Sequence, residues 1–307
     1  MLVYTLKRLG LALLVTLAVS MLSFALLYLS GDPAAAIAGE TANAEDIEAV
    51  RVYYGFDRPW VVQYGEWMFN AIRGDFGESY YFKLPVSQLV AERLSVTMLL
   101  GVCGISFALL TAVPLGVAAA VRPNSLIDRI ALFLSVMGQA MPSFWFGLVL
   151  IVLFSIKLRI LPPSGSDSWQ NFVMPTIVLG YYAMPAIMRL TRAGMLDVLG
   201  ADYVRTARAK GAGEFRVMFK HALRNAIIPV VSLAAVQMGF MLGGSIVVES
   251  IFALHGAGYL AWESIGRNDL PTVQALILVF SMFYIVFTFL SDLLNAWLDP
   301  RMKIGRA

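Results

Sequence analysis

The sequence has 307 residues, of which 59% are hydrophobic and only 14% are charged, and its formal net charge is +3. Soluble domains carry about one quarter charged residues, so this composition excludes an ordinary soluble enzyme or binding module. The single cysteine, Cys103, excludes an intrachain disulfide and a cysteine-based metal cluster.

Six long apolar stretches follow one another along the chain. About 20 apolar residues, at 1.5 Å per residue, are enough for a helix to cross the hydrocarbon core of a bilayer. The fourth stretch contains Pro175 and Pro185, which membrane helices tolerate when neighbouring helices satisfy the freed backbone groups. The six predicted spans are Leu9–Leu29, Val96–Val121, Ile130–Ile156, Phe172–Leu190, Ile227–Phe252 and Gln274–Leu298. The predicted fold class is therefore an all-α integral membrane protein with a packed bundle of six transmembrane helices.

The first apolar stretch follows Lys7 and Arg8 and resembles the start of a signal peptide. It has 21 residues, whereas the apolar part of a signal peptide has about 7–15. We therefore expect an uncleaved first span.

Lysine and arginine are distributed unevenly between the two sides of the predicted bundle. Of the 23 such residues, 15 fall on the side of both termini and 8 on the other side. Because basic residues are enriched in cytoplasmic loops, this predicts that both termini are cytoplasmic. The loop between the first two spans, residues 30–95, is then outside and carries ten acidic and five basic residues.

This outer loop contains three predicted helical segments. Asn43 is a suitable N-cap for the first, which ends at Gly55. The second begins with Pro59 at its first position and ends at Gly74. The third, Leu84–Leu94, is amphipathic and leads into the second span. Two interpretations remain open: a structural cap on the bundle, or a docking surface for an external partner.

The segment Tyr203–Ala226 is basic and polar within an apolar chain. Its six Lys and Arg residues would each cost about 2.5–3.5 kcal/mol at the centre of a span, so the segment stays outside the lipid. Asp202 is a candidate cap for a helix reaching Lys210, and Gly211–Gly213 separates it from a second helix that starts at Glu214. The second helix has a basic and an apolar stripe, formed by Arg216, Lys220 and Arg224 and by Phe215, Met218, Phe219 and Ala222.

Such a basic amphipathic segment has three physical interpretations. It binds anionic lipid headgroups, it is a solvated connector, or it docks a cytoplasmic protein against which a glycine allows close backbone approach. The residues alone leave all three open. Nucleic acid is not an expected partner, because the basic residues lie against the membrane.

The spans offer few groups for chemistry. Asp292 and Glu249 lie near the ends of spans and are expected to be structural, paired or interfacial. His221 and His255 fall on opposite sides of the membrane, so no metal site is expected. The sequence contains no phosphate-binding G-x-x-x-x-G-K-[ST] motif, so ATP hydrolysis by this chain is not expected.

The fifth span contains the stretch Val236–Ser245, rich in glycine and methionine. These residues favour helix packing, or alternatively a pliable lining for a solute pathway. Candidates for a translocation pathway are Gln237, Met238 and Met241.

Three classes of function compete at this point. The first is a transport subunit whose segment Tyr203–Ala226 docks a cytoplasmic protein. The second is a secondary transporter or channel that needs no ATPase; it is disfavoured by the lack of charges near the membrane midplane and of internal repeats. The third, an intramembrane enzyme, lacks paired carboxylates, metal-ligand spacing and a nucleophile–histidine pair.

The stretch YVRTARAKGAGEFRVMFKHALRNAIIPV, Tyr203–Val230, closely resembles the cytoplasmic signature of permease subunits of binding-protein-dependent ABC importers. The form Arg-Thr-Ala-Arg-Ala-Lys-Gly is typical of the first, B-type permease of the dipeptide, oligopeptide and nickel branch. Further matches are SGDP (Ser30–Pro33), GFDRP (Gly55–Pro59), GDFG (Gly74–Gly77), PSFWFG (Pro142–Gly147) and LDPR (Leu298–Arg301). The chain departs from the family at Leu223–Arg224, where the general pattern has Leu-Pro, and at Leu254–Gly258, where the branch often has Trp-Pro-Gly-x-Gly.

The resemblance implies a type I permease bundle with a helical periplasmic loop and a coupling helix that seats in a cleft of an ATPase subunit. Arg205-Thr206-Ala207 stand where the general family has Glu-Ala-Ala. The residues expected to couple to the ATPase are Tyr203, Arg205, Thr206, Ala207, Arg208, Ala209, Lys210 and Gly211. Residues 1–95 would form the first span and outer loop, and residues 96–307 the permease core with its coupling loop at 191–226.

The resemblance also implies partners and a location. This chain would form half of a translocation pathway with a second homologous permease. One or two ATP-binding cassette subunits would bind ATP and Mg²⁺, no cofactor would be held here, and an extracytoplasmic binding protein would deliver the solute. The location would be a bacterial or archaeal plasma membrane. The expected cargo is peptide, with glutathione, nickel complexes and other small solutes left open.

Overall fold

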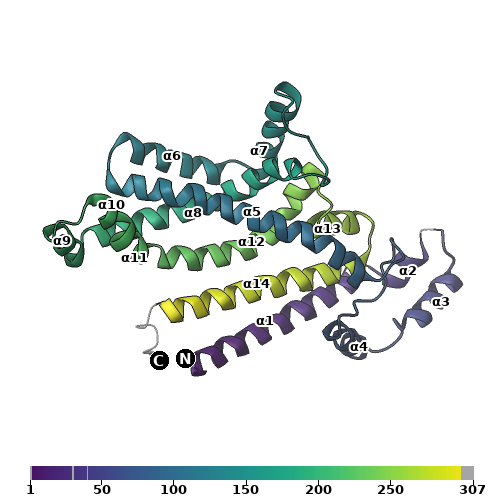
Figure 1. The fold of residues 1–307 in the computed structure, drawn as a ribbon. Helices are drawn as coiled ribbons and strands as arrows, with labels where there is room; N and C mark the ends of the chain where they lie inside the picture. The colour runs from purple at the N-terminus through teal and green to yellow at the C-terminus, as the bar shows by residue number, and fades with distance from the viewer. Residues whose placement is uncertain (1, 30, 40, 299–307) are drawn as a thin grey trace.

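The computed structural model describes residues 2–29, 31–39 and 41–298, and the chain is largely helical (Figure 1). Within these residues, five helices are long and apolar enough to cross a membrane, and they run side by side as a bundle. They are α1 (Leu2–Leu29), α5 (Val86–Val121), α8 (Gln170–Leu199), α12 (Ile228–Phe252) and α14 (Leu270–Leu298). Ser30 and residues 299–301, which belong to two of the sequence motifs, lie outside the described part of the chain.

The predicted third span is a bent pair of helices. α6 (Leu126–Ala140) is followed by α7 (Ser143–Leu150) and its π-helical continuation η1 (Ile151–Lys157). The helix direction bends by 106° between the two halves. Pro142 disfavours helical backbone at the residue before it, and Met141 is extended, with φ −82° and ψ 125°. The stretch is long and apolar enough to be one span, as predicted from the sequence, but the bend within it was not predicted. α7 turns sharply away from the direction of α6 (Figure 1) and packs against α8 and α12, with Leu150 buried in the core.

The core of the bundle is the crossing of α5 and α8. A Cβ atom added at Gly180 would lie 2.5 Å from the carbonyl oxygen of Gly104, and one at Gly116 would lie 2.8 Å from that of Met188. Glycine lets the two backbones approach at these points, as small residues commonly do between membrane helices. Buried side chains from α5, α8 and α12, among them Leu100 and Ile187, fill the space around the crossing.

α1 lies along α14 at the edge of the bundle (Figure 1). Ser23 Oγ donates to the carbonyl oxygen of Gln274 at 3.1 Å, and the Gln274 amide donates back to the carbonyl oxygen of Ser23 at 3.3 Å. Arg8 Nη1 lies 2.9 Å from Asp292 Oδ2. Asp292 is therefore a paired, structural acid, as predicted.

We call the end of the bundle formed by residues 31–95 and α13 (Ala257–Gly266) the acidic end. It carries α2 (Pro33–Ala38), α3 (Ala44–Tyr54) and α4 (Trp60–Ile72). α3 has the predicted cap, because Asn43 Oδ1 accepts from the N–H of Asp46 at 2.8 Å, and it has the predicted stop at Gly55, with φ +71°. The predicted third segment leads into the second span, as expected: from Val86 onward it is the first part of the 36-residue α5.

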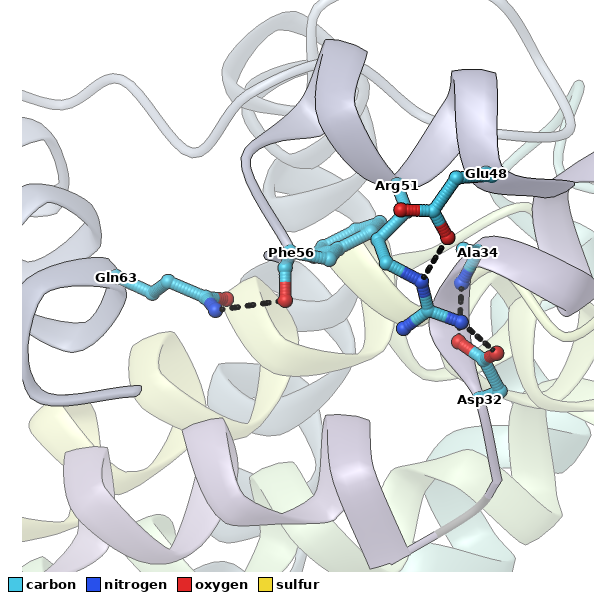
Figure 2. Close-up of polar contacts among 6 residues, drawn as sticks. All are labelled: Asp32, Ala34, Glu48, Arg51, Phe56 and Gln63. Carbon is cyan, nitrogen blue, oxygen red and sulfur yellow. Dashed lines mark hydrogen bonds and ion pairs between the residues drawn. The ribbon is translucent and has the colours of Figure 1, made fainter. Parts of the chain in front are cut away.

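Figure 2 shows how the short helices of the acidic end are joined. Arg51 of α3 contacts two acids, Asp32 Oδ2 at 2.6 Å and Glu48 Oε2 at 3.1 Å. The amide of Gln63 in α4 donates to the carbonyl oxygen of Phe56 at 3.3 Å. These contacts connect α2, α3 and α4 into one helical platform.

We call the opposite end of the bundle, formed by Tyr203–Ala226, the basic end. It carries α9 (Asp202–Ala209) and a second helical segment made of α10 (Glu214–Arg216), the π-helical η2 (Val217–Leu223) and α11 (Arg224–Ala226). These elements follow directly after the end of α8 in Figure 1. The helix, glycine break and second helix predicted from the sequence are therefore present.

Candidate functional site

α9 is a short helix that ends in a left-handed glycine. The Gly211 N–H donates to Arg208 O at 2.9 Å, the Ala212 N–H donates to Ala207 O at 3.1 Å, and Gly211 has φ +81°. This is the Schellman arrangement, which needs a residue that tolerates positive φ. Asp202 was expected to cap this helix; instead Ala201 is the N-cap residue and makes no side-chain cap. The Asp202 carboxylate lies in the first turn, where it still complements the helix dipole.

The residues predicted to couple to an ATPase share one surface. Of the eight, Ala207 is half-buried and the other seven are exposed. Sequence reasoning omitted Val204, which is fully buried in the same helix. The signal was present, because Val204 is a large aliphatic residue in an otherwise polar and basic helix. Val204 anchors α9 and leaves its basic face free.

The second helical segment is attached to the bundle along a different face from the one predicted. Its π-helical part changes the spacing of the side chains. Val217, Ala222 and Ala226 are buried, and the two alanines pack against residues near the ends of α5 and α8. Phe215 and Phe219, predicted for the apolar stripe, are 73% and 47% exposed, with ring centroids 4.5 Å apart. The segment therefore presents an aromatic pair together with its basic residues.

Polar contacts across the glycine break join α9 to the second segment. Arg208 Nε and Nη2 contact the two carboxylate oxygens of Glu214 at 2.8 and 3.1 Å. The Arg208 guanidinium lowers the pKa of Glu214 by hydrogen bonding to its charged form. The Asn225 amide donates to the Tyr203 hydroxyl at 2.8 Å. These four side chains are exposed, so the contacts set the relative placement of the two helices without closing their surface.

The last turns of α8 connect this surface to the bundle. Arg192 contacts both oxygens of the buried Asp128 on α6, at 2.7 Å each. A Cβ atom at Gly194 would lie 3.1 Å from the carbonyl oxygen of Ala226, so α8 and α11 approach closely. The second helical segment is therefore packed against α8, and α8 is in turn ion-paired to α6.

A cavity of about 570 Å³ opens between α8, α12 and the bent α6–α7 pair. Its wall is mostly apolar, with neutral polar groups from α6, α7, α8 and α12: Gln139, Ser143, Tyr182 and Gln237. Of the three predicted pathway residues, Gln237 and Met241 line this cavity. Met238 faces α5 instead, where its Cε would lie 3.0 Å from a Cβ atom at Gly101. Met238 thus has the packing role that the sequence left open.

The acidic end holds two fully buried carboxylates. Glu249 accepts from the Thr97 hydroxyl and from the N–H of Tyr259, both at 2.8 Å. Asp269 accepts from the Ser79 hydroxyl at 2.6 Å and from the N–H of Tyr80 at 2.8 Å. Both acids are structural, since each joins segments far apart in the sequence. Within the described residues, no group of three or more His, Cys, Asp or Glu side chains is arranged to hold a metal ion.

A membrane bundle with a basic surface at one end and an uncharged cavity between its helices defines a transport protein. Comparison with known proteins gives the family. Residues 112–304 match the binding-protein-dependent transport system inner membrane component, and residues 1–101 match the N-terminal part of such components. The chain belongs to this family and is a permease of a binding-protein-dependent ABC importer.

Relatives that match almost the whole length of the chain are named more specifically. The glutathione transport system permease protein GsiC of Escherichia coli K12 is 43% identical over 305 residues, covering 99% of each chain. The protein of the same name from Salmonella typhi is 42% identical over 304 residues, again covering 99% of each chain. A chain of the MetNI methionine ABC transporter has the same fold, with a TM-score of 0.58 and 18% identity over 69% of this chain and 97% of that one.

Proposed function

We propose that this permease carries small peptides such as glutathione across a bacterial plasma membrane, with its basic end facing the cytoplasm. The distribution of lysine and arginine supports the orientation. The name shared by relatives at 42–43% identity supports the cargo.

The basic end is the proposed docking surface for an ATP-binding cassette subunit. The observation that carries this proposal is the asymmetry of α9, in which Val204 is buried and Tyr203, Arg205, Arg208 and Lys210 are exposed. The exposed rings of Phe215 and Phe219 add apolar surface beside these charges. A solvated connector needs no exposed aromatic pair, whereas an interface commonly has aromatic and arginine residues at its centre.

The partners follow from this assignment. A second, homologous permease completes the pathway, as membership of the ABC importer family implies. The ATP and Mg²⁺ bind to the cassette subunits, and an extracytoplasmic binding protein delivers the solute to the acidic end. The surplus of acidic residues in the platform of α2–α4 supports docking to a basic surface of that protein.

The variant Gly211→Asp tests the docking surface. Gly211 has φ +81°, and an added Cβ atom meets no atom within 4 Å, so the substitution strains the end of α9 and adds an anion to a basic surface. We expect normal amounts of the chain in the membrane, with ATPase co-purification and ATP-driven uptake both reduced at least about tenfold, since 1.4 kcal/mol of lost contact is a factor of ten.

Gly213→Asp is the matched control. Gly213 also has open space around it, but its φ is −64°, which any residue adopts. This variant should retain most of the bound ATPase. Normal uptake with Gly211→Asp would refute the docking surface, and a chain that purifies alone yet moves solute when reconstituted would favour a transporter independent of ATPases.

A further inference from the structure

One arginine of α8 lies at the edge of the cavity. Val178, Tyr182 and Ala186 line the cavity at intervals of four residues along one face of α8. Arg189 follows three residues later, and its Nη1 donates to Oε1 of the cavity-lining Gln139 at 3.2 Å. The guanidinium is therefore hydrogen-bonded to the cavity wall through Gln139, although Arg189 is not itself among the lining residues.

Arg189 differs from Arg192, which lies one turn further along the same helix. Arg192 forms two hydrogen bonds to the carboxylate of Asp128. Arg189 instead donates from Nη1 to neutral side chains only, to Ser135 Oγ at 2.9 Å and to Gln139. None of the ion pairs in the described part of the chain includes Arg189. Nε and Nη2 are therefore available for a further acceptor.

An arginine without a counter-ion is costly in a membrane helix unless it faces a water-filled cavity or pairs with a ligand. The residues that line the cavity include no Asp, Glu, Lys or Arg. Arg189 thus gives an uncharged cavity one cationic edge. The planar guanidinium fork presents parallel N–H donors that match the two oxygens of a carboxylate.

We propose that Arg189 binds a carboxylate of the solute while the solute occupies this cavity. The inference rests on the proposed function, and it assigns the solute class as molecules with a free carboxylate, such as peptides with an unmodified C-terminus. Gln139 holds the guanidinium at the cavity edge, and the uncharged wall places no anion against the incoming carboxylate.

The test uses the purified permease–ATPase complex without the binding protein, so that the preference of that protein does not enter. The two probes are reduced glutathione and the derivative in which both of its carboxyl groups are converted to uncharged amides, here called the glutathione diamide. Saturation-transfer NMR measures the binding of each probe to the wild-type complex and to the variants Arg189→Gln, Arg189→Lys and Arg129→Gln. Arg129 is the matched control, because it is exposed on α6 and is not among the cavity-lining residues.

In the wild type, glutathione should bind more tightly than its diamide. Arg189→Gln should weaken glutathione binding about tenfold, the usual effect of losing one charge-assisted hydrogen bond, and leave diamide binding unchanged. Arg189→Lys should recover part of the loss, and Arg129→Gln should behave as wild type. Equal weakening of both probes by Arg189→Gln, or no weakening of glutathione, would overturn the proposal. Reduced accumulation of Arg189→Gln in the membrane, together with an unchanged preference for glutathione over its diamide, would also overturn the proposal. That result would place Arg189 against lipid phosphates.

ATP-driven uptake of glutathione by the wild type, with the binding protein present, separates this inference from the proposed function. Uptake together with unchanged probe binding in Arg189→Gln overturns only the role of Arg189. A wild-type complex that neither takes up nor binds glutathione overturns the proposed cargo and the carboxylate site together.

Discussion

The acidic end and the basic end of the bundle are stabilised by different kinds of polar contact. At the acidic end, the buried Glu249 and Asp269 receive hydrogen bonds from segments up to 190 residues away in the sequence. At the basic end, the charged contacts between its two helical segments are exposed and local, as between Arg208 and Glu214. Buried charge-assisted hydrogen bonds hold a structure firmly, whereas exposed ion pairs contribute little. The acidic end is therefore held more firmly by its own polar contacts than the basic end is.

Of the substitutions that test this comparison, Glu249→Gln should cause the largest loss of stability. The amide keeps one acceptor oxygen but turns its NH₂ group toward groups that donate, so buried donors such as the Thr97 hydroxyl or the Tyr259 N–H lose their partner. We expect the free energy of unfolding to fall by about 3 kcal/mol, visible as a lower thermal midpoint in detergent. Glu45→Gln removes an exposed acid at the same end and should leave the midpoint unchanged. Equal midpoints for both variants would contradict the proposed difference between the two ends.

Asp269→Asn should have a smaller effect at the same end. Its neighbours include the hydroxyls of Ser79 and Thr272, which can rotate to accept from the new amide. We expect a loss of about 2 kcal/mol in the free energy of unfolding, and faster proteolysis of the loop that contains Tyr80. The exposed Asp57→Asn serves as its control. A loss as large as that of Glu249→Gln would show that the hydroxyls do not rotate.

Glu214→Gln should change stability least, because its pair with Arg208 is exposed. Arg208 lowers the pKa of Glu214, so the small stabilisation is present above the ordinary carboxylate pKa and is lost as the pH falls through the lowered value. We expect an unchanged thermal midpoint at neutral pH but weaker coupling of ATP hydrolysis to uptake, with recovery when the two charges are exchanged by Arg208→Glu and Glu214→Arg. A large drop in the midpoint would mean that the basic end is self-sufficient.

Much of this architecture follows from the sequence. Runs of apolar residues located the five long helices, because burial in lipid demands about 20 of them in succession. Cap and stop residues located α3, since Asn43 and Gly55 act through local geometry alone. The bend at Pro142 was missed because apolarity measures affinity for lipid and carries no information about direction. α13 was missed because its ten residues lie between two long apolar runs.

The candidate sites were only partly predictable for a related reason. The basic surface is encoded within one continuous segment, so the spacing of charges and glycines in Tyr203–Gly211 was sufficient to find it. The cavity is assembled from four separate elements, and a single sequence does not show which face of each one turns inward. Gln237 and Met238 are neighbours in the chain, yet only Gln237 lines the cavity. The free guanidinium of Arg189 could be recognised only once Arg192 had been seen to bind Asp128.

α8 gives the permease a mechanical property that none of its separate contacts describes. It is one helix of 30 residues, which carries the cavity wall along its middle and ends beside α9. At 1.5 Å per residue α8 is about 45 Å long, so a rigid rotation of about 10° about one end of the helix displaces the other end by about 8 Å. That travel approaches the width of a helix. A small tilt of α8 at the basic end is therefore large enough to widen or narrow the cavity that the middle of the helix lines.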